Sequence, residues 1–246
     1  RLRSVAARSE VAAVSAALGL LDEREVLVFD LDGTLVDSGP EIRATLDLAL
    51  RDCGIAGVNE DDWVNLHSPL VHIVQDALAQ RHASAMHLPA VLAAYGRRLA
   101  GSGFELSVPY AGVQDFLSDR VRRGHRLAVC TNKGHAEALR MLAHFGLLDF
   151  FHGVVGADSA RAAKPDAAPL ELVLQRLDAQ PAQAVLVGDT HVDGECARNA
   201  GVAFLWHRSG YGDPALTAAF ALAAFDSWLT LLLGNAATEE ALSLQG

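Results

Sequence analysis

The sequence predicts an α/β fold, a doubly wound, Rossmann-like parallel sheet, into which an α-helical cap domain is inserted. Short runs rich in valine and leucine alternate with helical patterns, as in parallel sheets whose strands are joined by helices. A much longer segment separates the first run from the second than separates any later pair. That segment has helical periodicity and no strand pattern, so we expect an insertion after the first strand.

Each predicted strand is a short apolar run followed by a polar or turn-forming residue. The strands are expected at residues 25–30, 125–131, 151–157, 184–189 and 202–207. Helices are expected at residues 112–123, 133–146, 166–178 and 192–200. We therefore expect a core domain formed by residues 25–39 and 107–246.

The predicted insertion, residues 40–106, contains the helical stretches "EIRATLDLALRDCG", "PLVHIVQDALAQRH" and "LPAVLAAYGRRLAG". In open parallel sheets, ligands bind beyond the carboxyl ends of the strands. A helical domain attached at that edge would cover the site and select what enters it.

An N-terminal helical extension is predicted over residues 1–24. Its apolar residues recur at helical spacing, which indicates an amphipathic helix lying on the core; they are Val11, Val14, Leu18 and Leu21. The alternative is a signal peptide, which Glu10 disfavours because it interrupts the apolar run.

The C-terminal segment 214–233 is also strongly apolar. Asp226 and Ser227 interrupt it where the centre of a bilayer would fall, which argues against a membrane span. We predict two short helices that pack on the core.

Composition limits the partners and the compartment. A formal net charge of −10 over 246 residues disfavours nucleic acid and anionic membranes, which carry charge of the same sign. Cys53, Cys130 and Cys196 are odd in number and widely spaced, which favours reduced thiols in a cytoplasmic protein. The sequence leaves the oligomeric state open, and a homodimer is one alternative.

Acidic residues follow two of the predicted strands. Asp30 and Asp32 lie two residues apart and can point the same way, whereas Asp189 and Asp193 close a second strand and open a helix. If those strands are neighbours, the carboxylates crowd one pocket, which requires protonation or a cation. Ligands that are all oxygen favour a hard ion such as Mg²⁺.

Two more strand ends complement these acids. Thr131 and Asn132 in "CTNKG" leave the second strand, where a hydroxyl and the N–H groups of a helix start can hold phosphoryl oxygens. Lys164 in "AAKPD" precedes a helix that Pro165 is expected to open, and it offers a point charge to a phosphoryl group. The set indicates phosphoryl transfer through an aspartate.

The motifs "DLDGT", "TN", the lysine of "AKPD" and "GDTHVD" resemble, in order and spacing, the four motifs of the haloacid dehalogenase superfamily. The insertion is similar to the superfamily's α-helical cap at its first, or C1, position. "FDLDGTLVDS", "VPYAGV" and "TNKG" are closest in wording to the phosphoglycolate phosphatase group. The cap stretch "WVNLHSPLVHIVQDAL" departs from that group because it lacks a glycine of the substrate loop.

The resemblance implies a role for each motif residue. Asp30 is implied as the nucleophile that becomes an aspartyl phosphate, and Asp32 as the acid and base that serves the leaving alcohol and then water. Asp189 is implied as a Mg²⁺ ligand with Asp30 and the main-chain carbonyl of Asp32, and Asp193 as a supporting acid. Thr131 and Lys164 are implied as phosphate-binding and charge-stabilising residues.

These roles predict a Mg²⁺-dependent phosphatase that acts on a small phosphorylated metabolite such as phosphoglycolate. The alternatives are a sugar-phosphate mutase, a nucleotide or pyrophosphate phosphatase of the same superfamily, and a catalytically silent regulatory protein. A phosphonate hydrolase would need a cap lysine, and residues 40–106 contain none.

A few further side chains have two interpretations. His67 and His72 in the cap could contact substrate, and Arg97 and Arg98 could bind a substrate carboxylate. Exposed positions on helices explain these side chains more simply.

Overall fold

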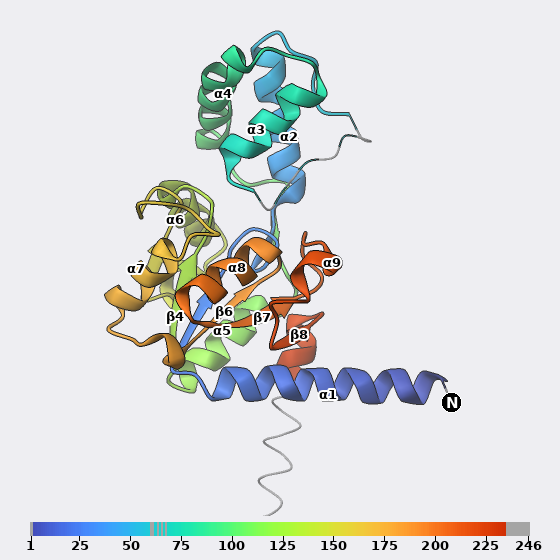
Figure 1. Ribbon diagram of the computed structural model, residues 1–246, viewed down its shortest axis with the longest axis vertical. Coiled ribbons are helices and arrows are strands. Elements are labelled where there is room, and N and C mark those ends of the chain that lie inside the picture. The colour runs from blue at the N-terminus through green and yellow to red at the C-terminus, as the bar shows by residue number, and fades with distance from the viewer. Residues whose placement is uncertain (1, 60–61, 63, 65, 67, 235–246) are drawn as a thin grey trace, which may run out of the picture.

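The structure is a computed structural model that describes residues 2–59, 62, 64, 66 and 68–234, with side chains from residue 11 onward. A core of sheet and helices occupies the middle of the molecule (Figure 1). A group of helices, α2 to α4, lies beyond one end of this core, and helix α1 crosses the opposite end. None of the described helices is long and apolar enough to cross a membrane.

The main sheet has the strand order β5-β4-β1-β6-β7-β8 in the described part of the chain, and every neighbouring pair is parallel. Its strands are β1 (Val26–Phe29), β4 (Arg126–Cys130), β5 (Gly153–Val155), β6 (Ala184–Gly188), β7 (Ala203–His207) and β8 (Ala223–Phe225). The predicted α/β class and the first five of these strands are confirmed. Strand β1 lies between β4 and β6, so the two strands that end in acidic residues are neighbours, which is the condition stated for a shared acidic pocket.

Helices cover both faces of the sheet, and they match the predicted segments. They are α5 (Val113–Arg122), α6 (His135–His144), α7 (Ala168–Arg176) and α8 (His191–Ala200), with short 3₁₀ turns η2 (Leu148–Phe150) and η3 (Pro181–Gln183). Side chains of β1 alternate between two apolar clusters, because successive strand residues point to opposite faces. Leu27 and Phe29 belong to one cluster, and Val26 and Val28 to the other.

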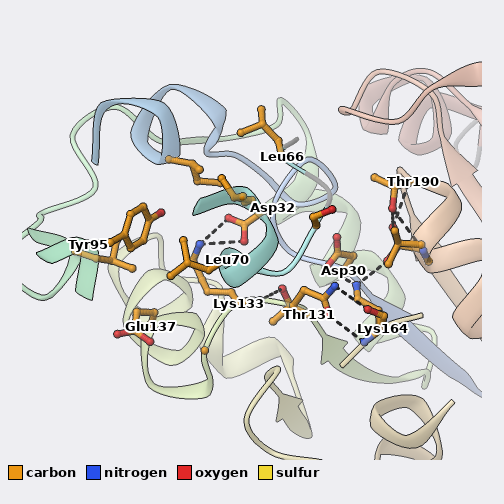
Figure 2. Close-up of a pocket in the computed structure, with 18 of the residues that line it drawn as sticks. Asp30, Asp32, Leu66, Leu70, Tyr95, Thr131, Lys133, Glu137, Lys164 and Thr190 are labelled. Carbon is orange, nitrogen blue, oxygen red and sulfur yellow. Dashed lines mark hydrogen bonds and ion pairs between the residues drawn. The ribbon is translucent and has the colours of Figure 1, made fainter. Parts of the chain in front are cut away.

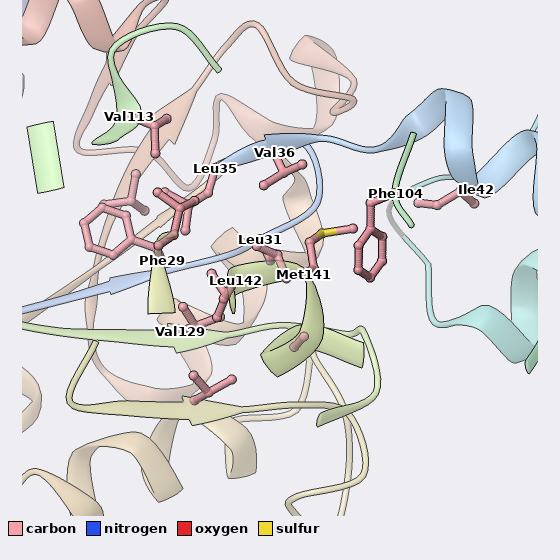
Figure 3. Close-up of a cluster of buried hydrophobic side chains, with 14 of the residues drawn as sticks. Phe29, Leu31, Leu35, Val36, Ile42, Phe104, Val113, Val129, Met141 and Leu142 are labelled. Carbon is pink, nitrogen blue, oxygen red and sulfur yellow. The ribbon is translucent and has the colours of Figure 1, made fainter. Parts of the chain in front are cut away.

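The cap segment consists of α2 (Gly39–Asp52), α3 (Leu70–Gln80), η1 (Ala85–His87) and α4 (Leu88–Ala100). Its two connections to the core pair with each other as antiparallel strands, β2 (Val36–Asp37) and β3 (Val108–Pro109). Figure 3 shows buried side chains running from Phe29 in the sheet to Ile42 and Phe104 at the foot of the cap. The division into domains at 39/40 and 106/107 falls beside these paired connections and stays a prediction.

Both terminal segments differ from expectation. Helix α1 (Leu2–Asp22) buries Leu18 and Leu21 but leaves Val11 69% exposed, so the predicted apolar stripe is wrong at its N-terminal end. The C-terminal segment is not simply two helices: α9 (Pro214–Thr217) and a helical stretch at 228–234 flank the sixth strand, β8. Strand β8 adds to the sheet edge beside β7 and contacts α1. Pairing with β7 outweighs local sequence preference there.

Candidate active site

The carboxyl ends of β4, β1 and β6 carry Thr131, Asp30 and Asp189, which places these side chains at one edge of the sheet. The main-chain N–H of Asp30 still donates to the carbonyl of Val187 at 2.9 Å, so the sheet pairing continues to the residue that bears the carboxylate. Topology therefore fixes the position of Asp30, because this residue directly follows β1, a strand inside the sheet.

Gly33 allows the chain to turn immediately after the two aspartates. Its φ is +84°, and a Cβ atom there would lie 2.3 Å from Oδ2 of Asp189. Only glycine combines this backbone conformation with so close an approach. The turn also directs the hydroxyl of Thr34 to Oδ1 of Asp189, to which it donates at 2.9 Å.

Three buried carboxylates form an acidic cluster: Asp30, Asp189 and Asp193 each offer an oxygen within 4.8 Å of the other two. Burial raises the pKa of Asp30 to about 7, against the opposing charge of Lys164 and with a further increase from Asp193. Burial, together with the negative charges of Asp193 and Asp30, raises the pKa of Asp189 well above its usual range. Because the charged forms are disfavoured, this cluster fits a divalent cation with oxygen ligands, such as Mg²⁺.

Asp193 is held at the start of α8 by a reciprocal capping arrangement with Thr190. The hydroxyl and the main-chain N–H of Thr190 donate to Oδ2 of Asp193 at 2.7 and 3.1 Å. Oδ1 of Asp193 accepts from Nζ of Lys164 at 2.6 Å. Asp193 therefore lies at the site, as the sequence predicted, and both of its carboxylate oxygens accept hydrogen bonds from protein groups.

Lys164 bridges two members of the acidic cluster. Its ammonium is 2.6 Å from Asp193 and 2.8 Å from Asp30, and the residue is only 2% exposed. Burial alone would lower the pKa of Lys164, but Asp193 and Asp30 outweigh it and raise that pKa well above the usual value. The lysine is therefore a fixed positive charge beside the carboxylate of Asp30.

Asn132 positions the main chain of Lys164. Its amide donates to the carbonyl of Lys164 at 3.1 Å and accepts from the N–H of the same residue at 3.0 Å. The expected role of Pro165 is wrong, because α7 begins at Ala168 and Pro169 occupies its first turn. Asn132, rather than a helix start, holds the lysine in place.

Asp32 lies apart from the acidic cluster and is paired with Lys133. Nζ of Lys133 is 2.9 Å from each carboxylate oxygen of Asp32 (Figure 2). The hydroxyl of Ser38 donates to Oδ1 of Asp32. The side chains of Asp30 and Asp32 were expected to converge on one cation. Only that of Asp30 belongs to the acidic cluster. No sequence pattern predicts a role for Lys133 or Ser38, although Lys133 lies within the motif "TNKG".

Strand β7 and the loop after it hold Asp189 in place. The N–H of Tyr211 donates to its Oδ2 at 2.7 Å, and the indole of Trp206 donates to its main-chain carbonyl at 3.0 Å. The phenol of Tyr211 in turn donates to Asp37 at 2.8 Å and accepts from Ser38 N–H at 2.8 Å. No motif signals Tyr211, because its role depends on the loop after β7.

A pocket of about 190 Å³ lies between the core and the cap. Its core wall is polar and contains Asp30, Asp32, Thr131, Asn132, Lys133, Gly134, Glu137, Lys164, Thr190, Val192 and Asp193. Its cap wall is mainly apolar and contains Ile42, Leu66, Ser68, Leu70, Ile73, Tyr95, Gly96 and Leu99. Every predicted site residue except Asp189 lines this pocket, and Asp189 lies behind it.

Among the described residues, the other cap side chains considered from the sequence do not line the pocket. His72 is exposed on α3, and His67 lies outside the described residues. Arg97 and Arg98 are exposed, and Arg98 pairs with Asp52 at 2.6 Å. Tyr95, which was not singled out, is the large polar side chain of the cap wall, 4% exposed.

Comparisons with known proteins agree with this arrangement. A model of the haloacid dehalogenase-like hydrolase family matches residues 27–207. A plasmid-borne phosphoglycolate phosphatase of Cupriavidus necator is 35% identical over 201 residues, covering 78% of this chain and 84% of that protein. A phosphoglycolate phosphatase of Vibrio vulnificus is 33% identical and covers 78% of this chain and 88% of its own. A crystal structure of a predicted phosphoglycolate phosphatase from Haemophilus somnus has a TM-score of 0.75 at 25% identity, covering 85% of this chain and 97% of that one.

Proposed function

Since the chain belongs to the haloacid dehalogenase-like hydrolase family and is a phosphatase, we propose that it hydrolyses a small phosphorylated metabolite through an aspartyl phosphate, with Mg²⁺ as cofactor. Phosphoglycolate is the leading substrate, because the relatives described above carry that activity in their names. The ion pair between Lys164 and Asp30 at 2.8 Å, set beside two further buried carboxylates, is the observation that carries this proposal.

The donor set supports Mg²⁺. Asp30, Asp189 and Asp193 are buried, supply carboxylate oxygens, and lie close enough to share one ion. We assign Asp30, Asp189 and the main-chain carbonyl of Asp32 as ligands, with Asp193 as a supporting acid. When bound, the ion would offset negative charge on the carboxylates and on a phosphate.

In the proposed first step, a carboxylate oxygen of Asp30 attacks phosphorus while the bond from phosphorus to the leaving alcohol oxygen breaks. Asp32 donates its proton to that alcohol oxygen, so the product leaves as a neutral hydroxyl. Lys164 and the hydroxyl of Thr131 bind phosphoryl oxygens, and Lys164 remains beside Asp30 throughout. Asn132 serves this step by holding the main chain of Lys164.

In the proposed second step, water attacks the phosphorus of the aspartyl phosphate and the bond to the Asp30 oxygen breaks. Asp32, now ionised, accepts a proton from the water, which restores both aspartates and releases phosphate. Ser38 and Lys133 bind the carboxylate of Asp32 and therefore orient it for both transfers.

The cap is proposed to select the substrate. We assign residues 1–24 as a helical extension, 25–39 with 107–246 as the core domain, and 40–106 as the cap domain. The pairing of β2 with β3 supports this division, because both connections run side by side between core and cap. We also propose a cytoplasmic location, supported by cysteines that are all free.

The test is hydrolysis of p-nitrophenyl phosphate and 2-phosphoglycolate by the purified protein with Mg²⁺, with EDTA, and as the Asp30→Asn variant. We expect EDTA and Asp30→Asn each to abolish turnover of both esters. Acid-quenched enzyme should carry an acyl phosphate on Asp30; borohydride reduction releases the phosphate and converts this residue to homoserine, which mass spectrometry detects in the peptide that contains position 30.

The matched control is Asp52→Asn, which removes a carboxylate from an exposed ion pair on α2 and should retain activity. Folded, Mg²⁺-treated wild-type protein that hydrolyses no phosphoester would overturn the proposal. If the esters are hydrolysed but no modified Asp30 peptide is detected, only the aspartyl-phosphate intermediate would be overturned.

A further inference from the structure

We propose that Lys133 determines specificity by binding a second anionic group of the substrate, so that the preferred substrate is a small phosphomonoester carrying a carboxylate close to its phosphate. This inference rests on the proposed phosphatase function. It assigns Lys133 a contact with substrate in addition to its contact with Asp32.

Lys133 places an ammonium on the pocket wall. The side chain is 8% exposed, its residue lines the pocket, and its contacts with Asp32 are both 2.9 Å (Figure 2). An ammonium has three N–H donors, and one carboxylate engages at most two of them. At least one donor of Lys133 is therefore available to a bound molecule.

Among the described residues that line the pocket, the other cation is Lys164, which is already shared by Asp30 and Asp193. The cap wall offers no charged side chain in the described part of the chain; its polar groups are Ser68 and Tyr95. An anionic group of the substrate beyond its phosphate therefore finds its counter-charge at Lys133.

The position of Lys133 limits the distance between the two anionic groups. Its main-chain N–H donates to the hydroxyl of Thr131 at 3.1 Å, and Thr131 is the residue proposed to bind phosphoryl oxygens. The pocket volume of about 190 Å³ is below that of pockets for drug-sized ligands. Both facts favour a spacer of very few atoms, as in 2-phosphoglycolate.

The experiment compares 2-phosphoglycolate with its carboxamide, 2-phosphoglycolamide, which has nearly the same shape and lacks the charge. The wild type should show a kcat/KM at least about tenfold higher for the carboxylate, as expected for one charge-assisted contact. In Lys133→Met this ratio should fall to about one, and in Lys133→Arg it should stay close to the wild-type ratio. Each is measured with saturating Mg²⁺ on the full chain.

Glu137→Gln is the matched control, since it changes one charge on the first turn of α6 in the same wall of the pocket. It should keep or raise the preference for the carboxylate, because it removes a like charge.

The outcomes separate this inference from the proposed function. If Lys133→Met lowers both rates by the same factor, Lys133 only positions Asp32 and the inference is wrong. A wild-type ratio near one also overturns it, whether or not the variants fold. If the wild type hydrolyses p-nitrophenyl phosphate but neither 2-phosphoglycolate nor 2-phosphoglycolamide, the proposed substrate class is wrong and the proposed phosphatase activity is retained. Failure on all three esters overturns the proposed function itself.

Discussion

The two walls of the pocket are built by different means. The core wall presents polar side chains at the ends of parallel strands, and Asp30, Thr131 and Lys164 are each held by the sheet or by a buried partner. The cap wall presents Ile73, Tyr95 and other side chains from helices whose positions depend on packing against one another.

This difference separates chemistry from selection. Polar groups in the core wall have paired partners, so replacing one leaves another buried group without its counterpart. Apolar groups in the cap wall contribute shape, and replacing one changes the volume of the pocket. Apart from Lys133, changes in the core wall should therefore affect all substrates alike, and changes in the cap wall should affect the ratio between substrates.

The largest expected effect is that of Lys164→Met in the core wall. The substitution leaves Asp30 and Asp193 without their shared cation, which should destabilise the fold by about 3–5 kcal/mol. The kcat should fall by at least about a thousandfold for every phosphoester, because the charge beside Asp30, the proposed nucleophile, is lost. Urea unfolding and hydrolysis of p-nitrophenyl phosphate measure the two effects.

The stability control is Arg98→Met, which also replaces a long cationic side chain by methionine but removes it from an exposed ion pair with Asp52. The urea midpoint of this variant should match that of the wild type. Equal destabilisation by both substitutions would contradict the view that burial distinguishes the core-wall pair.

The second prediction concerns how Mg²⁺ and protons compete for the acidic cluster. The folded pKa of Asp30, about 7, lies above the value of 3.8 for an exposed aspartate. Proton binding therefore stabilises the metal-free fold at low pH, and this contribution is lost as the pH rises from about 4 through about 7. The increase in melting temperature caused by Mg²⁺ should consequently be small at pH 5 and large at pH 8.

At a hundredfold excess over its dissociation constant, the ion should add about 2.7 kcal/mol. Asp189→Asn is the control, and it should remove most of the Mg²⁺-induced shift at pH 8. A shift that is the same at both pH values would show that the cluster does not exchange protons for the ion.

The third prediction concerns the shape of the cap wall. Leu70→Ala should widen the pocket and raise the ratio of kcat/KM for p-nitrophenyl phosphate to that for 2-phosphoglycolate by about tenfold. Leu92→Ala is the matched control, because Leu92 is a half-buried cap leucine that does not line the pocket. It should lower stability without changing the ratio; equal shifts in both variants would contradict selection by pocket shape.

The same difference between the walls explains what the sequence could predict. Asp30, Thr131 and Asp189 follow apolar runs, and parallel strands bring their carboxyl ends to one edge, so these residues could be placed from the sequence. Lys133 could not, because its partner Asp32 lies 101 residues earlier in the chain. Tyr211 could not, because its contact with Asp189 depends on the loop after β7. Strand β8 was missed because its three residues lie between helical segments and are fixed by pairing with β7.

The cap wall was predictable only as a set of helices. Helical periodicity identifies buried faces, but it does not determine which side chains face a neighbouring domain. Tyr95 therefore gave no signal, and His72, which the sequence allowed at the site, is exposed outside it.

The smallest expected effect concerns the outer surface of the cap. Arg98 donates to Asp52 at 2.9 and 2.6 Å, and this exposed pair joins the end of α4 to the end of α2. Because solvent screens the pair and neither residue lines the pocket, Arg98→Met should leave the preference for 2-phosphoglycolate over its carboxamide within about twofold of the wild type. The kcat/KM ratio of the two esters provides the measurement. A loss of preference in Arg98→Met with no loss in Lys133→Met would move recognition of the carboxylate from the core wall to the cap, and would overturn the specificity role proposed for Lys133.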